Sequence, residues 1–123
     1  MEIDDVRAAA ARLRPHLLPT PALESDWLSE AYGAPVTVLW ESLQRTGSFK
    51  LRGALNKLLL LAERGASRVL AVSAGNHGLG VAWAARLLGF EATVVVPAGA
   101  AAHKVAALRR LGAAIEVLGR AYD

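Results

Sequence analysis

The sequence predicts an α/β domain built on an open parallel sheet with helices on both of its faces. Three short apolar segments carry this prediction: RVLAVS, ATVVVP and AAIEVL, at residues 68–73, 92–97 and 113–118. Helical patterns alternate with these segments, and a glycine follows the second and the third helix. Strands that are apolar throughout and are joined by helices are typical of parallel sheets that lie between two helical layers.

The part of the chain before residue 41 is less regular. Its expected elements are a helix at residues 3–13, an extended proline-rich stretch at 14–25, a short helix from Ser25 or Asp26 to Tyr32, and a strand at 36–40. Proline fixes its own backbone angle and biases the residue before it, so a stretch with three prolines does not continue a helix. Ser25 or Asp26 suits a helix cap, Gly33 suits a helix stop, and VTVLW favours a strand.

The rest of the chain is regular. We expect helices at residues 49–61, 77–88 and 103–111, each preceding one of the three strands. In the first of these helices Leu51, Leu55 and Leu58 recur at helical spacing and mark the face that is buried. An irregular segment at residues 41–47 joins this regular part to the strand before it, and it is the best candidate for a domain boundary.

Length and composition exclude several classes of function. The chain has 123 residues, of which 54% are hydrophobic, and its net charge of +3 comes from scattered cations. Because no basic stripe is interleaved with aromatic residues, we expect no nucleic-acid partner. Cysteine is missing, which excludes thiolate metal sites and cysteine nucleophiles, and we name no metal ligand. The N-terminus lacks a secretory pattern and the longest apolar run, residues 58–62, is too short to span a bilayer, so we expect a cytoplasmic protein without a membrane partner.

Residues 73–80, SAGNHGLG, form a glycine-rich loop between a strand and a helix. Ligands of open α/β sheets bind beyond the carboxyl ends of the strands, and free N–H groups at a helix N-terminus attract anions. A phosphate or a carboxylate would fit, with side-chain hydrogen bonds from Ser73 and Asn76. The structural alternative is a tight turn at Gly75, close packing at Gly78 and a helix cap at Asn76. The glycine order differs from dinucleotide-binding loops and from P-loops, which disfavours a nucleotide-binding module.

A second loop, ESLQRTGSFK at residues 41–50, ends in a lysine at the start of an apolar helix. A cation at this place opposes the positive end of the helix, at a cost of roughly 0.3–1 kcal/mol when exposed. We expect the helix start, and partial burial behind Phe49, to favour the neutral amine of Lys50, which is a nucleophile toward aldehydes. In the structural alternative, Lys50 is a surface residue and Thr46 or Ser48 caps the helix. The two loops are expected to flank one cleft.

The two loops together resemble a known family. The segments ESLQRTGSFKLRGALNK, SAGNHGLGVAWAARLLG and VVVPAGAAAHKVAALRRLGA, in this order and spacing, resemble the fold-type II pyridoxal-phosphate enzymes. The group they are most similar to is the threonine/serine dehydratases, or threonine deaminases. The resemblance runs from TPALES to GRAYD and implies the small domain of the tryptophan-synthase-β-like fold for residues 41–123, truncated relative to the family. Residues 1–40 would belong to the large domain.

The resemblance implies roles for individual residues. Lys50 would bind the aldehyde of pyridoxal 5'-phosphate and later take the Cα proton of the substrate. Phe49 would pack beside the cofactor ring, and Asn76 would hydrogen-bond the cofactor's 3′ oxygen. The substrate carboxylate, rather than a phosphate, would lie on the second loop and be held mainly by backbone N–H groups of Ser73, Gly75, Asn76 and His77.

The implied activity is elimination of water from a small hydroxy amino acid, L-threonine or L-serine, to give a 2-oxo acid and ammonia. Ala74 stands where serine racemases of this group have a second serine, so racemisation is less expected. Family members are longer, and their phosphate loop and the partner of the pyridine nitrogen come after the part that this chain matches. We therefore expect the 123 residues to belong to a longer, homo-oligomeric enzyme and to be inactive alone. The alternative is a non-catalytic α/β module that keeps the fold.

Overall fold

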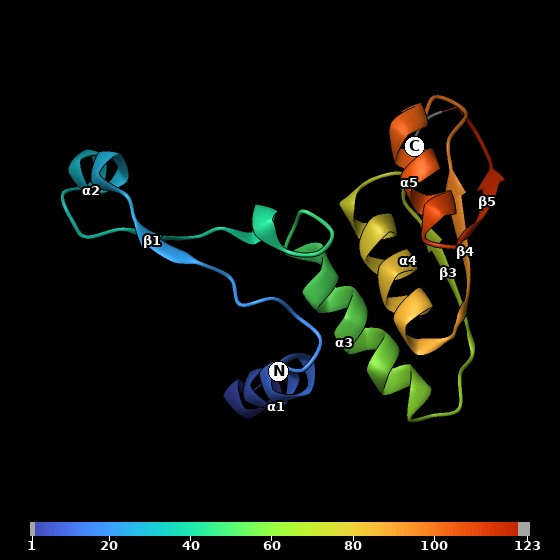
Figure 1. Ribbon diagram of the computed structural model, residues 1–123, viewed down its shortest axis with the longest axis horizontal. Helices are drawn as coiled ribbons and strands as arrows, with labels where there is room; N and C mark the ends of the chain where they lie inside the picture. The colour runs from blue at the N-terminus through green and yellow to red at the C-terminus, as the bar shows by residue number, and fades with distance from the viewer. Residues whose placement is uncertain (1, 121–123) are drawn as a thin grey trace.

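The computed structural model describes residues 2–120, which form an N-terminal part and a layered α/β body (Figure 1). The N-terminal part contains α1 (Ile3–Leu13), β1 (Ala22–Glu24), α2 (Asp26–Tyr32) and β2 (Thr37–Leu39), and the 3-10 turn η1 (Glu41–Leu43) follows. β1 and β2 pair as an antiparallel hairpin that carries α2 at its tip. β1 lies within the stretch that the prolines predicted to be extended, but its pairing was not predicted.

The body contains the alternating elements that the sequence predicted. They are α3 (Lys50–Ala62), β3 (Arg68–Val72), α4 (Asn76–Leu88), β4 (Glu91–Val96), α5 (Ala102–Arg110) and β5 (Ala114–Val117). The three strands form a parallel sheet in the order β3-β4-β5, with Val72 beside Val95 and Val96 beside Val117. The predicted α/β class and the open parallel sheet are confirmed.

The hydrophobic core lies between the helices and one face of the sheet. Leu51 and Leu55 of α3 are fully buried against Ala84 and Ala85 of α4, whose small side chains let the two helices approach. A second cluster joins the other side of α4 to the sheet and to α5; its buried members are Ala82, Val94, Val96, Leu108 and Ala113. α4 is therefore the central helix, and its position fixes where the loop before it lies.

No helix covers the other face of the sheet in the part of the chain that the structure describes. All three body helices lie on the same side of the strands (Figure 1). Leu70 and Val72 point to the opposite side and are 62% and 60% exposed. The second helical layer that the sequence predicted is therefore not supplied by residues 2–120. The segment RVLAVS was expected to be a buried strand between two helical layers, but only Ala71 of β3 is buried, because β3 is at the edge of the described sheet and has one covered face.

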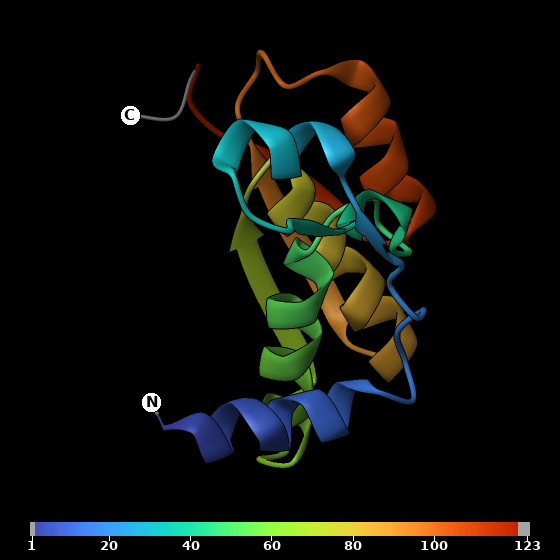
Figure 2. The same ribbon diagram turned by 90° about the vertical axis from the view of Figure 1, so that its left-hand side faces the viewer.

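The N-terminal helix is attached to the body. α1 crosses α3 near the C-terminal end of α3 (Figure 2), where Leu13 joins the same cluster as Leu58. The guanidinium of Arg12 donates a hydrogen bond of 2.6 Å to the side-chain oxygen of Asn56. The division of the chain at residue 40 into parts of two domains stays a prediction.

Candidate functional site

Lys50 begins α3, and its amine is open to solvent. Phe49 occupies the helix-cap position with helical backbone angles and makes no side-chain capping bond, so the predicted cap at Thr46 or Ser48 is wrong. The hydroxyl oxygens of Thr46 and Ser48 are buried without a hydrogen-bond partner among the residues described. The Lys50 Nζ atom lies 4.6 Å from the centroid of the Phe49 ring. Phe49 is 58% exposed and Lys50 is exposed too, so the expected burial of Lys50 behind Phe49 is not found.

The loop before α4 is organised by Ser73. Its Oγ atom accepts hydrogen bonds from the backbone N–H of Gly75 at 3.2 Å and of Gly78 at 3.1 Å. Gly75 is the cap residue of α4, so the predicted cap at Asn76 is wrong, and Asn76 is the first residue of the helix. Within residues 2–120 the N–H groups of Asn76 and His77 have no hydrogen-bond partner. They are available to an anion at the positive end of the helix.

Two glycines bring the starts of α3 and α4 together. A Cβ atom on Gly78 would lie 2.2 Å from the carbonyl oxygen of Ser73, which is closer than any contact that real structures tolerate. A Cβ atom on Gly80 would lie 3.2 Å from the carbonyl oxygen of Lys50 and 3.3 Å from the backbone of Leu51. The lysine-bearing turn and the first turns of α4 are therefore in direct contact, whereas the sequence predicted only that the two loops flank one cleft.

A groove of about 560 Å³ lies between α3 and the edge strand β3. Lys50, Phe49 and His77 line it, and its apolar wall includes Ala54 and Val81. Three other predicted site residues, Ser73, Gly75 and Asn76, are in the adjacent loop and not in the lining of this groove. The structure thus gathers the two loops at one place, with the amine and the histidine in the groove and the free N–H groups at its side.

An ion pair between Arg52, on the lysine-bearing turn, and Glu41 was not predicted from the sequence. Arg52 donates from Nε and Nη2 to Oε1 of Glu41, at 2.9 and 2.6 Å, and from Nη2 to the hydroxyl of Thr20 at 2.8 Å. Thr20 in turn donates to the same Oε1 atom at 3.0 Å. The sequence did contain a clue to this pair: Glu41 comes directly after the predicted strand, and Arg52, of opposite charge, is in the first turn of the next helix.

This ion pair predicts a loss of stability in acid. The guanidinium of Arg52 lowers the pKa of the Glu41 carboxyl from its ordinary value of 4.5, although burial acts in the opposite direction. A lowered pKa in the folded state stabilises the protein above the ordinary value, and the gain is lost as the pH falls below it. Urea unfolding at pH 7 and at about pH 3 should therefore show a larger acid-induced loss for the wild type than for Glu41→Gln. If the wild type and Glu41→Gln lose the same free energy of unfolding in acid, the Arg52–Glu41 pair does not stabilise the fold in this way.

Comparison with known proteins identifies the family of this chain. Residues 13–123 match the family described as "Pyridoxal-phosphate dependent enzyme". The chain belongs to this family. The prediction that pyridoxal phosphate is the cofactor is therefore confirmed at the level of the family. The predicted resemblance to pyridoxal-phosphate enzymes is confirmed as well.

Relatives in this family have several activities. L-threonine ammonia-lyase of Thermotoga maritima is 41% identical over 122 residues, which are 98% of this chain and 30% of that protein. L-threo-3-hydroxyaspartate ammonia-lyase of a Pseudomonas species is 50% identical over 113 residues, which are 90% of this chain and 35% of that protein. The solved structure of maize serine racemase has a TM-score of 0.87 at 35% identity and covers 98% of this chain and 37% of its own. The chain thus spans about a third of the length of these proteins.

The residues present fit the cofactor of this family. An exposed amine on a groove is accessible to an aldehyde, and the neighbouring Phe49 ring can lie against a pyridine. Gly53 is one helical turn after Lys50, and a Cβ atom placed on it would meet nothing within 4 Å, so this helix face is clear. The free N–H groups of the loop suit a carboxylate.

Among the described residues, no helix is long and apolar enough to cross a membrane.

Proposed function

We propose that this chain is the lysine-bearing part of an enzyme that eliminates water from L-threonine or L-serine, giving a 2-oxo acid and ammonia. The observation that carries the proposal is the meeting of two groups: the exposed amine of Lys50 in the groove, and the unpaired N–H groups of Asn76 and His77 beside it. The 41% identity to an L-threonine ammonia-lyase supports the choice of reaction.

The residues of this chain would share the chemistry. When bound, pyridoxal phosphate supplies an electron-withdrawing ring that makes the Cα proton of an amino acid removable. Lys50 would hold the cofactor at its aldehyde through Nζ, and the Lys50 amine would also accept the Cα proton of the substrate. The N–H groups of Asn76 and His77, on the loop that Ser73 and Gly75 shape, hold the substrate carboxylate.

Two side chains would orient the ring. Phe49 would pack beside it, and the amide of Asn76 would hydrogen-bond the cofactor's 3′ oxygen. The β-hydroxyl leaves with a proton as water, and hydrolysis of the resulting enamine gives the 2-oxo acid and ammonia. Ala74 offers no side chain that could exchange a proton on the opposite face of Cα, which supports elimination over racemisation.

A second substrate has a specific observation in its favour. The L-threo-3-hydroxyaspartate ammonia-lyase is 50% identical to this chain, and its named substrate is also a β-hydroxy amino acid. The same residues would perform the same elimination on it, so the substrates are to be compared directly.

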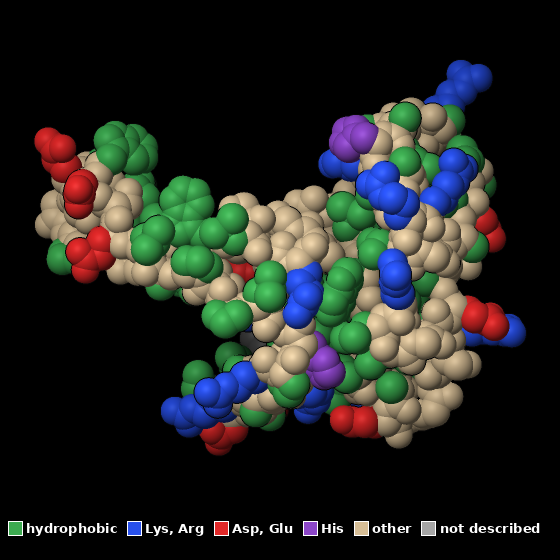
Figure 3. All heavy atoms as spheres, viewed as in Figure 1, with side chains coloured by type: hydrophobic (Ala, Val, Ile, Leu, Met, Phe, Trp, Pro, Cys, Tyr) green, Lys and Arg blue, Asp and Glu red, His purple; other side chains and the backbone are tan. Residues whose placement is uncertain are grey.

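The proposal extends to the surrounding protein. Residues 1–40 would belong to a large domain, residues 41–123 to a small one, and the full enzyme would be a cytoplasmic homo-oligomer. Hydrophobic side chains gather along the hairpin and α2 (Figure 3), where Trp27 and Tyr32 are 73% and 77% exposed. Exposed apolar surface of this kind supports burial against further protein.

The test uses the full protein that contains this sequence. It is incubated with pyridoxal phosphate, reduced with borohydride, digested and mapped by mass spectrometry, and it is assayed for 2-oxo acid from L-threonine, L-serine and L-threo-3-hydroxyaspartate. We expect the cofactor on Lys50 and product from at least one substrate. A label elsewhere, or none, would refute the proposal and favour a non-catalytic module. Label on Lys50 without product would refute the reaction only.

A further inference from the structure

The first turn of α3 has no cap of the usual kind. Helix starts are commonly held by a side chain that accepts from the first free N–H groups, and here the cap residue Phe49 supplies no such bond. The nearby hydroxyls of Thr46 and Ser48 have no partner within the described part of the chain. The orientation of this turn must therefore be held by other contacts.

The ion pair of Arg52 and Glu41 is on this turn. Arg52 comes two residues after Lys50, and residues at this spacing in a helix do not face each other. Arg52 also lines the groove that Lys50 lines, and its guanidinium joins this turn to Glu41 and to Thr20. The Oε1 atom of Glu41 receives three donors, two from Arg52 and one from Thr20, at distances from 2.6 to 3.0 Å.

Both anchors of the arginine are themselves fixed. The carboxyl of Glu41 is on η1, and its side chain is only 20% exposed. Thr20 is in the segment before β1, and Gln44 ties that segment to the loop through bonds of 2.9 and 3.1 Å to the carbonyl and N–H of Leu18. Gly80 packs α4 against the backbone of Lys50 itself. The turn is thus fixed by α4 and by the ion pair.

We propose that Glu41 and Arg52 are positioning residues that fix the first turn of α3, and with it the direction of the Lys50 amine toward the groove. This inference rests on the proposed function of Lys50. Removing the Glu41 charge leaves the guanidinium without its anion and loosens the turn while the helix beyond it stays packed by Leu51 and Leu55. A displacement of about 1 Å of a reacting group lowers rates by up to about 10²-fold.

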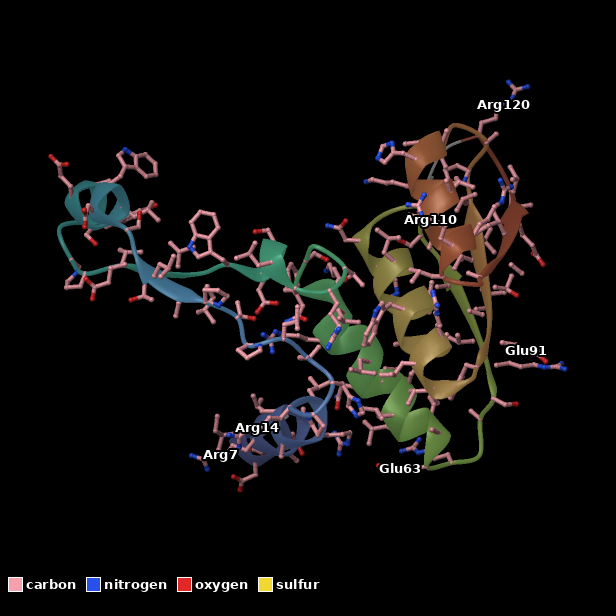
Figure 4. All side chains as sticks on the ribbon, in the orientation of Figure 1. Arg7, Arg14, Glu63, Glu91, Arg110 and Arg120 are labelled. Atoms are coloured by element: carbon pink, nitrogen blue, oxygen red, sulfur yellow. The ribbon has the colours of Figure 1, made fainter. Side chains whose placement is uncertain are left out.

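The test uses the full protein with Glu41→Gln, Arg52→Gln and the double variant. The control is Glu91→Gln, which breaks the exposed Arg68–Glu91 pair on the outer side of the sheet, where Figure 4 labels Glu91. The main readout is the rate at which borohydride traps pyridoxal phosphate on Lys50. The second is hydrogen exchange of the first-turn amides of α3 without cofactor, and the third is kcat and KM. All are measured where circular dichroism shows each variant to be folded.

We expect each single variant to lower the trapping rate and kcat by about ten- to a hundred-fold. KM should change by less than about threefold, because an orientation effect acts on the reacting group more than on substrate binding. First-turn amides should exchange faster, and the double variant should be no slower than the single variants, since the two residues act as one unit. Glu91→Gln should match the wild type.

Three outcomes would overturn the inference: a folded Glu41→Gln protein that traps at the wild-type rate, single effects that multiply in the double variant, or a loss that only follows the fraction of unfolded protein. Trapping on Lys50 needs no turnover, so the inference can survive a wrong choice of substrate. If wild-type Lys50 is never trapped, the proposed function fails and this inference fails with it.

Discussion

Replacing Lys50 with alanine is expected to abolish covalent attachment of pyridoxal phosphate and to lower kcat by at least about 10²–10⁴-fold, the usual contribution of a positioned base. The lysine has two roles in the proposed reaction, since it binds the aldehyde and later takes the Cα proton. The measurement is the borohydride-trapped label in the full protein together with 2-oxo acid formation. Lys104→Ala, on α5, is the matched lysine control and should leave both values unchanged.

This loss should not arise from unfolding. Lys50 is exposed at the start of α3, where alanine is an equal or better helix former and where a cation opposes the helix dipole. The melting temperature of cofactor-free Lys50→Ala should therefore equal or exceed that of the cofactor-free wild type. A variant that keeps the label or its kcat would remove Lys50 from the mechanism, whatever the role of the neighbouring loop.

Gly78→Ala is expected to be the most damaging single-methyl change in the loop. The added Cβ would lie 2.2 Å from the backbone carbonyl oxygen of Ser73, so α4 or the loop must move. Forced repacking of this kind costs about 1–3 kcal/mol of unfolding free energy, and occasionally more. The shift also separates the Gly78 N–H from the Ser73 hydroxyl, which holds the proposed carboxylate site. Urea unfolding measures the loss of stability, and KM for the amino acid measures the damage to the loop.

Gly53→Ala is the matched control because it adds the same methyl group to another helical glycine. Its Cβ would meet nothing within 4 Å, and the helix gains about 0.5–1 kcal/mol when alanine replaces an interior glycine. The two variants should therefore shift the free energy of unfolding in opposite directions. If Gly78→Ala proves as stable as the wild type, the close contact between the loop and the start of α4 is not a constraint on the sequence.

Much of the secondary structure could be predicted because it depends on local patterns. The cap at Ser25 and the left-handed stop at Gly33 are observed where short-range preferences put them. The pairing of β1 with β2 could not be predicted, because a three-residue strand between prolines carries no alternation to recognise and depends on its partner. The burial of β3 was overestimated because an apolar sequence reveals neither which strand is at an edge nor which face is covered.

The candidate site could also be predicted from the sequence only in part. Residues with distinctive chemistry in a short motif, Lys50 and the SAGNHG loop, could be named from the sequence, and the structure brings their loops together. The ion pair of Arg52 with Glu41 could not, because charged side chains are common and only the folded chain shows which two of them meet. The structural alternative for the glycine-rich loop named Asn76 as the cap of α4, whereas Ser73 makes the bonds from outside the helix.

The sequence by itself determined the order of strands and helices in the α/β body and the family, and it named candidate residues for the chemistry, because hydrophobic periodicity, glycine positions and motifs are local properties of the chain. Only the tertiary structure decided which face of the sheet is covered, that Lys50 is exposed, and what holds its helical turn in place. These features depend on contacts between segments far apart in the sequence, such as Thr20 with Arg52, and no local pattern of residues encodes them.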